Sequence, residues 1–140
     1  MKSVPNKLVI LFFLTLMLLV GCSGKNNPVS NSSISGKYQY TGYDQENNII
    51  SEGIIEIIFD GNEINGSKVL NGGYEEGEGE ITGSIDENGK INIYLNPHKV
   101  YGTVLNGNYS NKVIKGKRLV NGGPPIPFNL GSFTAKRIPF

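Results

Sequence analysis

The stretch Gly77–Asn96, GEGEITGSIDENGKINIYLN, decides the fold class, because apolar and polar residues alternate on both sides of a turn signal. On one face before the turn the residues are small or aliphatic: Gly79, Ile81, Gly83 and Ile85. On one face after it they are aliphatic: Ile91, Ile93 and Leu95. Between them Asn88-Gly89 accepts the positive φ of a tight hairpin turn. One apolar and one polar face predict antiparallel strands with a core on a single side.

The same two signals extend over residues 34–140, which suit a single domain. Turn signals recur at Asp60-Gly61, Asn71-Gly72, Asn106-Gly107 and Asn121-Gly122, and no window shows a sustained helical stripe. The segments between these turns predict eight strands. They lie near residues 36–43, 49–60, 63–70, 78–85, 90–96, 99–107, 111–120 and 131–138.

Glycines inside the predicted strands indicate how the sheet curves. Several follow an aliphatic residue and one intervening residue, as in Ile64-Asn65-Gly66, Ile81-Thr82-Gly83 and Ile114-Lys115-Gly116. A strand glycine costs stability but permits the strong coiling that closes a small barrel. We therefore expect an all-β fold, a small antiparallel up-and-down β-barrel of about eight strands around one apolar interior, with a two-sheet β-sandwich as the alternative.

The first and last predicted strands resemble the ends of lipocalin-like (calycin-like) barrels. The resemblance rests on Gly36-Lys37-Tyr38 and on Phe133-Thr134-Ala135-Lys136-Arg137. In that family a tryptophan near the start packs against a basic side chain of the closing strand, so the resemblance implies that Tyr38 stacks on Arg137. The alternative is that Tyr38 and Tyr40 are ordinary core aromatics and that Arg137 is a surface charge.

An apolar N-terminal segment precedes the domain. Lys2 and Lys7 are followed by the uncharged run Leu8–Val20 and then by Gly21-Cys22. Thirteen helical residues span about 20 Å, which is too short for a bilayer core of about 30 Å, so the pattern predicts an export signal with a signal-peptide helix over residues 1–21.

The tetrapeptide Leu19-Val20-Gly21-Cys22 resembles the lipobox of bacterial lipoproteins. The resemblance implies that the Cys22 thiol receives a diacylglycerol and that acyl chains such as palmitate anchor the mature chain, which would begin at Cys22. It places the protein in the cell envelope, and Ser23 implies the outer membrane if the host is a diderm bacterium. The alternative is that Cys22 is a small apolar residue of an ordinary signal sequence.

Residues 22–33 join this anchor to the domain. The segment after Cys22, SGKNNPVSNSS, is polar and turn-forming, so we expect a flexible tether. Because Cys22 is the only cysteine, no disulfide can form within one chain.

The sequence offers few residues of the kinds that act in catalysis. We therefore predict a non-enzymatic protein without cofactor, metal or nucleic-acid partner. The single histidine, His98, has no recognisable catalytic partner, and no phosphate-binding glycine motif occurs. The segment Tyr74–Glu80 concentrates four glutamates, Glu75, Glu76, Glu78 and Glu80. We expect these glutamates to form a solvated acidic face, and the alternative is that they bind calcium.

Charge divides the domain into two halves. All twelve acids lie between Asp44 and Glu87, whereas the chain after Asn88 carries eight basic residues and no acid. An up-and-down meander predicts that these halves form opposite walls. The basic wall either faces anionic lipid headgroups or an acidic glycan, or only keeps the barrel soluble.

The segment Asn121–Leu130, NGGPPIPFNL, is the longest predicted loop and carries the apolar residues Ile126 and Phe128. If it folds over a barrel mouth, these side chains either plug that end or line a ligand entrance. We take Tyr38, Tyr40, Ile126, Phe128 and Arg137 as candidate ligand-binding residues. The expected function is binding of a small apolar ligand by a lipid-anchored envelope protein. The alternative is a structural envelope lipoprotein that docks a protein partner.

Overall fold

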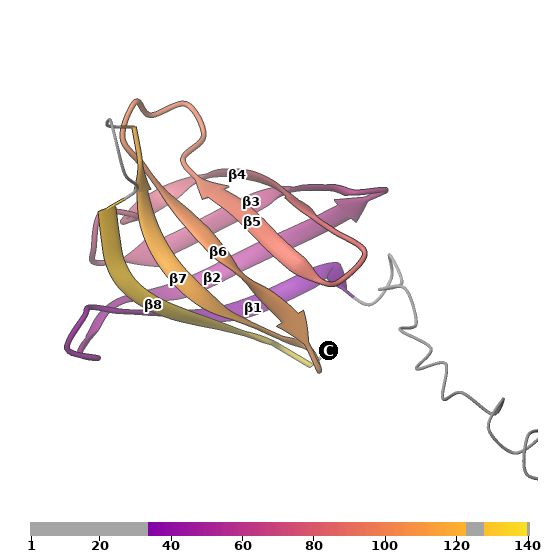
Figure 1. Cartoon of the computed structure of the whole chain (residues 1–140), viewed down its shortest axis with the longest axis horizontal. Helices are drawn as coiled ribbons and strands as arrows, with labels where there is room; N and C mark the ends of the chain where they lie inside the picture. Colours follow the sequence, from indigo (N-terminus) through magenta and orange to yellow (C-terminus); the bar gives the residue numbers. More distant parts are fainter. Residues whose placement is uncertain (1–33, 123–127, 140) are drawn as a thin grey trace, which may run out of the picture.

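The computed structural model describes residues 34–122 and 128–139, and they form a closed antiparallel barrel of eight strands (Figure 1). The strands are β1 (Gly36–Tyr43), β2 (Ile49–Asp60), β3 (Glu63–Asn71), β4 (Gly77–Ile85), β5 (Lys90–Leu95), β6 (Gly102–Ser110), β7 (Val113–Asn121) and β8 (Phe128–Arg137). Each pairs with the next along the chain, and β1 pairs with β8 to close the sheet. The predicted up-and-down barrel is confirmed, and the sandwich alternative is wrong.

The strand bounds depart from the prediction by more than one residue in β6, β7 and β8. β6 spans Gly102–Ser110 instead of residues 99–107, and β7 begins at Val113 instead of residue 111. The predicted turn at Asn106-Gly107 is wrong, because both residues pair with β7 inside β6 and the chain reverses at Asn111-Lys112, where φ is positive.

β8 begins at Phe128 instead of residue 131. This difference arises because Phe128 and Asn129 pair with Val120 and Leu119 of β7, with a register shift between Arg118 and Leu119. The predicted loop over residues 121–130 is therefore wrong for residues 128–130, which belong to the closing strand.

Alternation puts one apolar set inside the barrel, as the sequence pattern predicts. Ile81 and Ile85 of β4 are buried, as are the three aliphatic residues that alternate along β5. β2 follows the same rule, with Ile55 and Ile57 buried and Ile58 exposed. The core cluster draws side chains from all eight strands and also includes Ile34, just before β1.

Several strand glycines lie where neighbouring backbones approach closely. A Cβ atom on Gly83 would lie 2.2 Å from the carbonyl oxygen of Asn92 on β5. One on Gly116 of β7 would lie 2.4 Å from the Cα of Gly107, its partner on β6. These positions admit no side chain, which explains the recurring glycines of the sequence as requirements of barrel closure.

The barrel has two distinct ends. The connections that follow β1, β3, β5 and β7 form one end, which we call the mouth. The opposite end, which we call the base, holds Ile34 and the residues after β8 (Figure 1). The described chain therefore enters and leaves the barrel at the base.

Replacing Gly83 by alanine tests the close approach between β4 and β5. The added methyl group would overlap the β5 backbone, so Gly83→Ala should lower the free energy of unfolding by about 1–3 kcal/mol. Chemical denaturation measures this change, and Ser84→Ala, at the exposed neighbouring position, is the control expected to stay within about 0.5 kcal/mol of the parent. Equal stability of the two variants would contradict the steric argument.

Candidate functional site at the barrel mouth

A predominantly apolar hollow of about 370 Å³ opens at the mouth. Its lining comes from the β3–β4 and β5–β6 connections, the start of β6, the end of β7 and the start of β8. The lining residues are Tyr74, Tyr101, Gly102, Thr103, Val120, Phe128 and Leu130. Four segments that are distant in the sequence therefore line one concave surface. They lie side by side only because the barrel closes.

The rim of this hollow exposes large apolar side chains. Tyr74 is 78% exposed, Tyr101 is 69% exposed and Phe128 is 65% exposed. Val100, next to Tyr101, is exposed to a similar degree. Exposed apolar side chains are common singly, but a group of them around a concave surface is typical of a binding site.

A buried ion pair lies inside the barrel beneath the mouth. Arg118 of β7 donates from Nε to Oε1 of Glu75 and from Nη2 to Oε2, both at 2.8 Å. Both side chains are fully buried. The Tyr40 hydroxyl donates to Glu75 Oε1 at 2.9 Å, and the Thr103 hydroxyl contacts Oε2 at 3.4 Å. Because Thr103 also lines the hollow, the polar network and the apolar surface meet at this residue.

Further hydrogen bonds connect the pair to the mouth backbone. Arg118 Nη1 donates to the carbonyl oxygens of Tyr43 at 2.9 Å and Leu130 at 3.3 Å. The buried Lys68 ammonium donates to the carbonyl oxygen of Glu75 and, at 2.8 Å, to that of Gly77. The β3–β4 connection is thus held into the barrel end from two sides, and it carries Tyr74 to the rim.

Burial and charge shift the pKa values of this network in different directions. Burial raises the pKa of Tyr40, and the neighbouring Glu75 carboxylate raises it further. Burial alone would lower the pKa of Arg118, but its hydrogen bond to Glu75 and the nearby Tyr40 raise it overall. Burial lowers the pKa of Lys68, as does the nearby Lys99. Arg118 is therefore a permanent cation that requires the Glu75 charge.

The expectation that Glu75 belongs to a solvated acidic face is wrong. Glu75 is fully buried, whereas Glu76, Glu78 and Glu80 are exposed as predicted. The prediction of one wholly apolar interior is wrong for the same region, because Arg118 and Lys68 are among the largest fully buried side chains. The barrel interior near the mouth is polar and paired.

A signal for the two buried bases was present in the sequence. Arg118 shares the inward parity of Ile114 and Gly116 on β7, and Lys68 shares that of Ile64 and Leu70 on β3. Alternation alone is therefore enough to place both bases inside, and the expectation that Arg118 contributes to the basic wall is wrong. Their partner Glu75 lies in a connection, where no periodicity operates, so the pairing itself had no local signal.

The five candidate ligand residues do not form one site. Phe128 lines the mouth hollow, and Tyr40 lies buried beneath it in the Glu75 network. Tyr38 and Arg137 are register partners near the base, where the buried Tyr38 hydroxyl donates to the carbonyl oxygen of Ile34. Ile126 lies outside the described residues, and so do Cys22 and the predicted segments 1–21 and 22–33.

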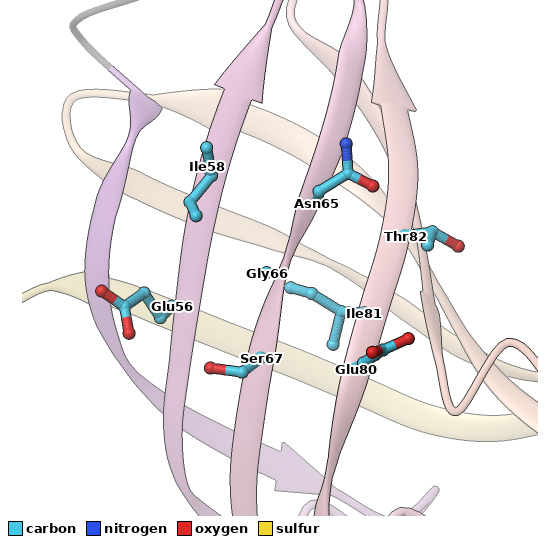
Figure 2. Close-up of a pocket in the computed structure, with 8 residues that line it drawn as sticks. All are labelled: Glu56, Ile58, Asn65, Gly66, Ser67, Glu80, Ile81 and Thr82. Carbon is cyan, nitrogen blue, oxygen red and sulfur yellow. The ribbon is translucent and has the colours of Figure 1, made fainter.

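A second hollow, of about 410 Å³, lies on the outer side of β2, β3 and β4 (Figure 2). Figure 2 shows Gly66 in the middle of its lining, between Ile58 and Ile81. Glu56 and Glu80 also line it. This surface is acidic and, unlike the mouth, carries no aromatic lining residue.

Other candidate chemistry has little geometric support. His98 Nε2 lies 3.6 Å from Glu80 Oε2, and both side chains are exposed. In residues 34–122 and 128–139, no three histidine, cysteine, aspartate or glutamate side chains are grouped as a metal site would need. The same residues include no helix with the length and hydropathy needed to cross a bilayer.

Comparison of the chain with protein-family models, with curated proteins and with solved structures finds no match. The proposed function therefore rests on the geometry of the mouth.

Breaking the buried ion pair from either side should destabilise the barrel strongly. Glu75→Gln and Arg118→Met each leave an uncompensated buried group, so each should lower the free energy of unfolding by about 3–5 kcal/mol. The double variant should lose less than the sum of the two single losses, because it removes both charges. Denaturant unfolding of the four proteins measures this coupling. Glu76→Gln, at the exposed neighbouring position, is the control, and additive losses would contradict the pairing.

The buried phenols predict unfolding at alkaline pH. Burial raises the pKa of both Tyr38 and Tyr40 in the folded protein. The unfolded chain ionises these groups near pH 10, so their contribution to stability is complete below about pH 10 and is lost as the pH rises further. Phenolate absorbance and circular dichroism, followed together, should show part of the ionisation coinciding with unfolding. Tyr38→Phe should reduce that part, and ionisation of both phenols before unfolding would refute the prediction.

Proposed function

We propose that this protein is a non-enzymatic, lipid-anchored binding protein of the cell envelope whose mouth hollow binds a small apolar ligand. The lipobox-like Leu19–Cys22 segment supports the export and acylation of Cys22, and residues 22–33 then act as the tether. The single observation that carries the binding role is the apolar hollow with its exposed aromatic rim.

The filled interior supports a ligand position at the mouth instead of deep in the barrel. Core side chains from all eight strands occupy the inside, and the Glu75–Arg118 pair closes it beneath the mouth. An eight-stranded barrel has an interior that side chains are able to fill. A ligand would therefore lie against Tyr101, Val120 and Phe128, with the Thr103 hydroxyl as a polar contact at the floor.

The direction of the mouth also supports this role. Ile34, where the chain enters the described barrel, belongs to the base. An anchor on the N-terminal side would thus leave the mouth away from the point of attachment and open to ligands.

A protein partner is the second candidate occupant of the mouth. Tyrosine and phenylalanine are enriched in protein interfaces, and Tyr74, Tyr101 and Phe128 are all more than half exposed. A photo-crosslinking residue at position 101 in native membranes would join a stoichiometric partner if docking is the function. The same residue at position 69, on the outer face of β3, should give no product.

Apolar ligand binding is testable with the neutral dye N-phenyl-1-naphthylamine, whose fluorescence rises in apolar sites. A chain beginning at Ser23 keeps every described strand and avoids a contribution from the anchor. We expect saturable binding that Phe128→Ser weakens by roughly tenfold, because the variant removes part of a burial contribution of about 1.5–3 kcal/mol.

Ile58→Ser is the matched control, since Ile58 is 59% exposed but lies on the opposite, acidic wall. It should leave the affinity unchanged. Failure of the parent chain to bind the dye saturably, or equal loss in both variants, would exclude the mouth as the apolar site.

A further inference from the structure

We propose that one outer wall of the barrel is a docking surface for anionic phospholipid headgroups. This basic wall is the outer face of β1, β6, β7 and β8 together with the β6–β7 turn. Its exposed lysines are Lys37, Lys112, Lys115, Lys117 and Lys136. The inference rests on the proposed function only in that an envelope anchor brings the barrel to a membrane. It does not depend on what the mouth binds.

Strand alternation directs the lysines outward. Lys115 and Lys117 flank the inward position of Gly116 on β7, and Lys136 follows the buried Ala135 on β8. Lys37 precedes the buried Tyr38 on β1. The four strands of the wall contain no aspartate or glutamate.

The register places Lys115, Lys117 and Lys136 among uncharged neighbours. Lys37 instead pairs with Glu56 of β2, at the seam with the acidic wall. Lys115 pairs with Asn108 on one side and Thr134 on the other, and Lys117 pairs with Asn106 and Ser132. Lys136 pairs with Val113 and with Gln39 of β1. Within the described residues the ion pairs join Arg118 to Glu75 and His98 to Glu80, and neither involves a lysine of this wall. The part of the basic wall on β7 and β8 thus retains its positive charge.

The opposite wall carries the opposite charge. The outward glutamates of β2, β3 and β4 are Glu52, Glu56, Glu63, Glu78 and Glu80. An anionic bilayer attracts one wall and repels the other, so the charge distribution both binds the barrel and sets its orientation.

The point where the chain enters the barrel brings the wall to the same membrane. Ile34 lies two residues before the start of β1, which belongs to the basic wall. The eleven residues Ser23–Ser33 would span at most about 36 Å. An anchor at Cys22 therefore holds the barrel within reach of the surface, on the side from which β1 starts.

A hollow on the wall carries side chains that are able to bind a headgroup phosphate. It has a volume of about 370 Å³ and is lined by Asn108, Ser110, Asn111, Val113 and Lys115. Amide and hydroxyl donors beside an ammonium group are suited to phosphate oxygens. This chemistry favours a phospholipid headgroup over a purely apolar partner.

The test uses the full chain isolated from cells and reconstituted into vesicles that carry a quencher on their headgroups. A fluorophore is attached to Asn108→Cys on the basic wall or, as matched control, to Ser67→Cys on the acidic wall; both positions are exposed. The wild-type chain, treated identically, gives any background from Cys22. Equimolar phosphatidylglycerol and phosphatidylcholine vesicles are compared with pure phosphatidylcholine.

We expect stronger quenching at position 108 on the anionic vesicles only, and loss of the difference in about 1 M salt, where the Debye length falls to about 3 Å. The triple variant Lys115→Gln, Lys117→Gln and Lys136→Gln should abolish the difference, whereas Glu63→Gln, Glu78→Gln and Glu80→Gln together should not. Unchanged thermal midpoints verify that these surface variants fold.

Equal quenching at positions 108 and 67, or quenching at position 108 that is independent of phosphatidylglycerol, would overturn the docking surface.

A separate flotation experiment with neutral vesicles in high salt tests whether the lipid anchor binds the chain to the membrane. A chain that floats but shows no difference between its two walls refutes the docking surface and leaves the anchor supported. A chain that fails to float refutes the anchor, and salt-sensitive flotation with anionic vesicles then still decides the docking surface.

Discussion

The closure of eight antiparallel strands constrains every other part of this protein. Such a barrel has an interior of the size that side chains fill, and here aliphatic residues, two tyrosines and a phenylalanine occupy it. Backbones that approach this closely admit only glycine at positions such as Gly83 and Gly116. The hollows at the mouth and on the outer walls are therefore formed by connections and outward-facing strand residues.

The buried network at the mouth solves a problem that closure creates. The end of a small barrel exposes unpaired backbone groups, and Arg118 and Lys68 donate to four of the carbonyl oxygens there. A buried guanidinium requires a compensating charge, and Glu75 supplies it from the β3–β4 connection. The same contacts position Tyr74 on the rim, so the polar pair below organises the apolar hollow above.

The mouth and the two outer walls of the barrel differ in their chemistry. The mouth presents aromatic side chains, the wall of β2–β4 presents carboxylates, and the wall of β1 and β6–β8 presents ammonium groups. An up-and-down meander produces this division directly, because segments near each other in the sequence become neighbouring strands. An anchored barrel with these surfaces would rest one wall on lipid and leave its mouth accessible.

Local pattern was sufficient for the fold class: alternation in Gly77–Asn96 and its equivalents specified eight strands, their inward faces and the acidic and basic halves. The Asn-Gly signals marked most of the turns, but Asn106-Gly107 lies inside β6, where its glycine faces Gly116 of β7. The parity of Arg118 and Lys68 along β7 and β3 also carried a signal that both are buried, although Arg118 was expected in the basic wall. The sequence by itself did not reveal that Glu75 leaves the exposed series of Glu76, Glu78 and Glu80, nor that Tyr74, Tyr101 and Phe128 share one hollow. Only the tertiary structure decided these features, because a connection has no periodicity and its side chains take their places from strands that are distant in the chain.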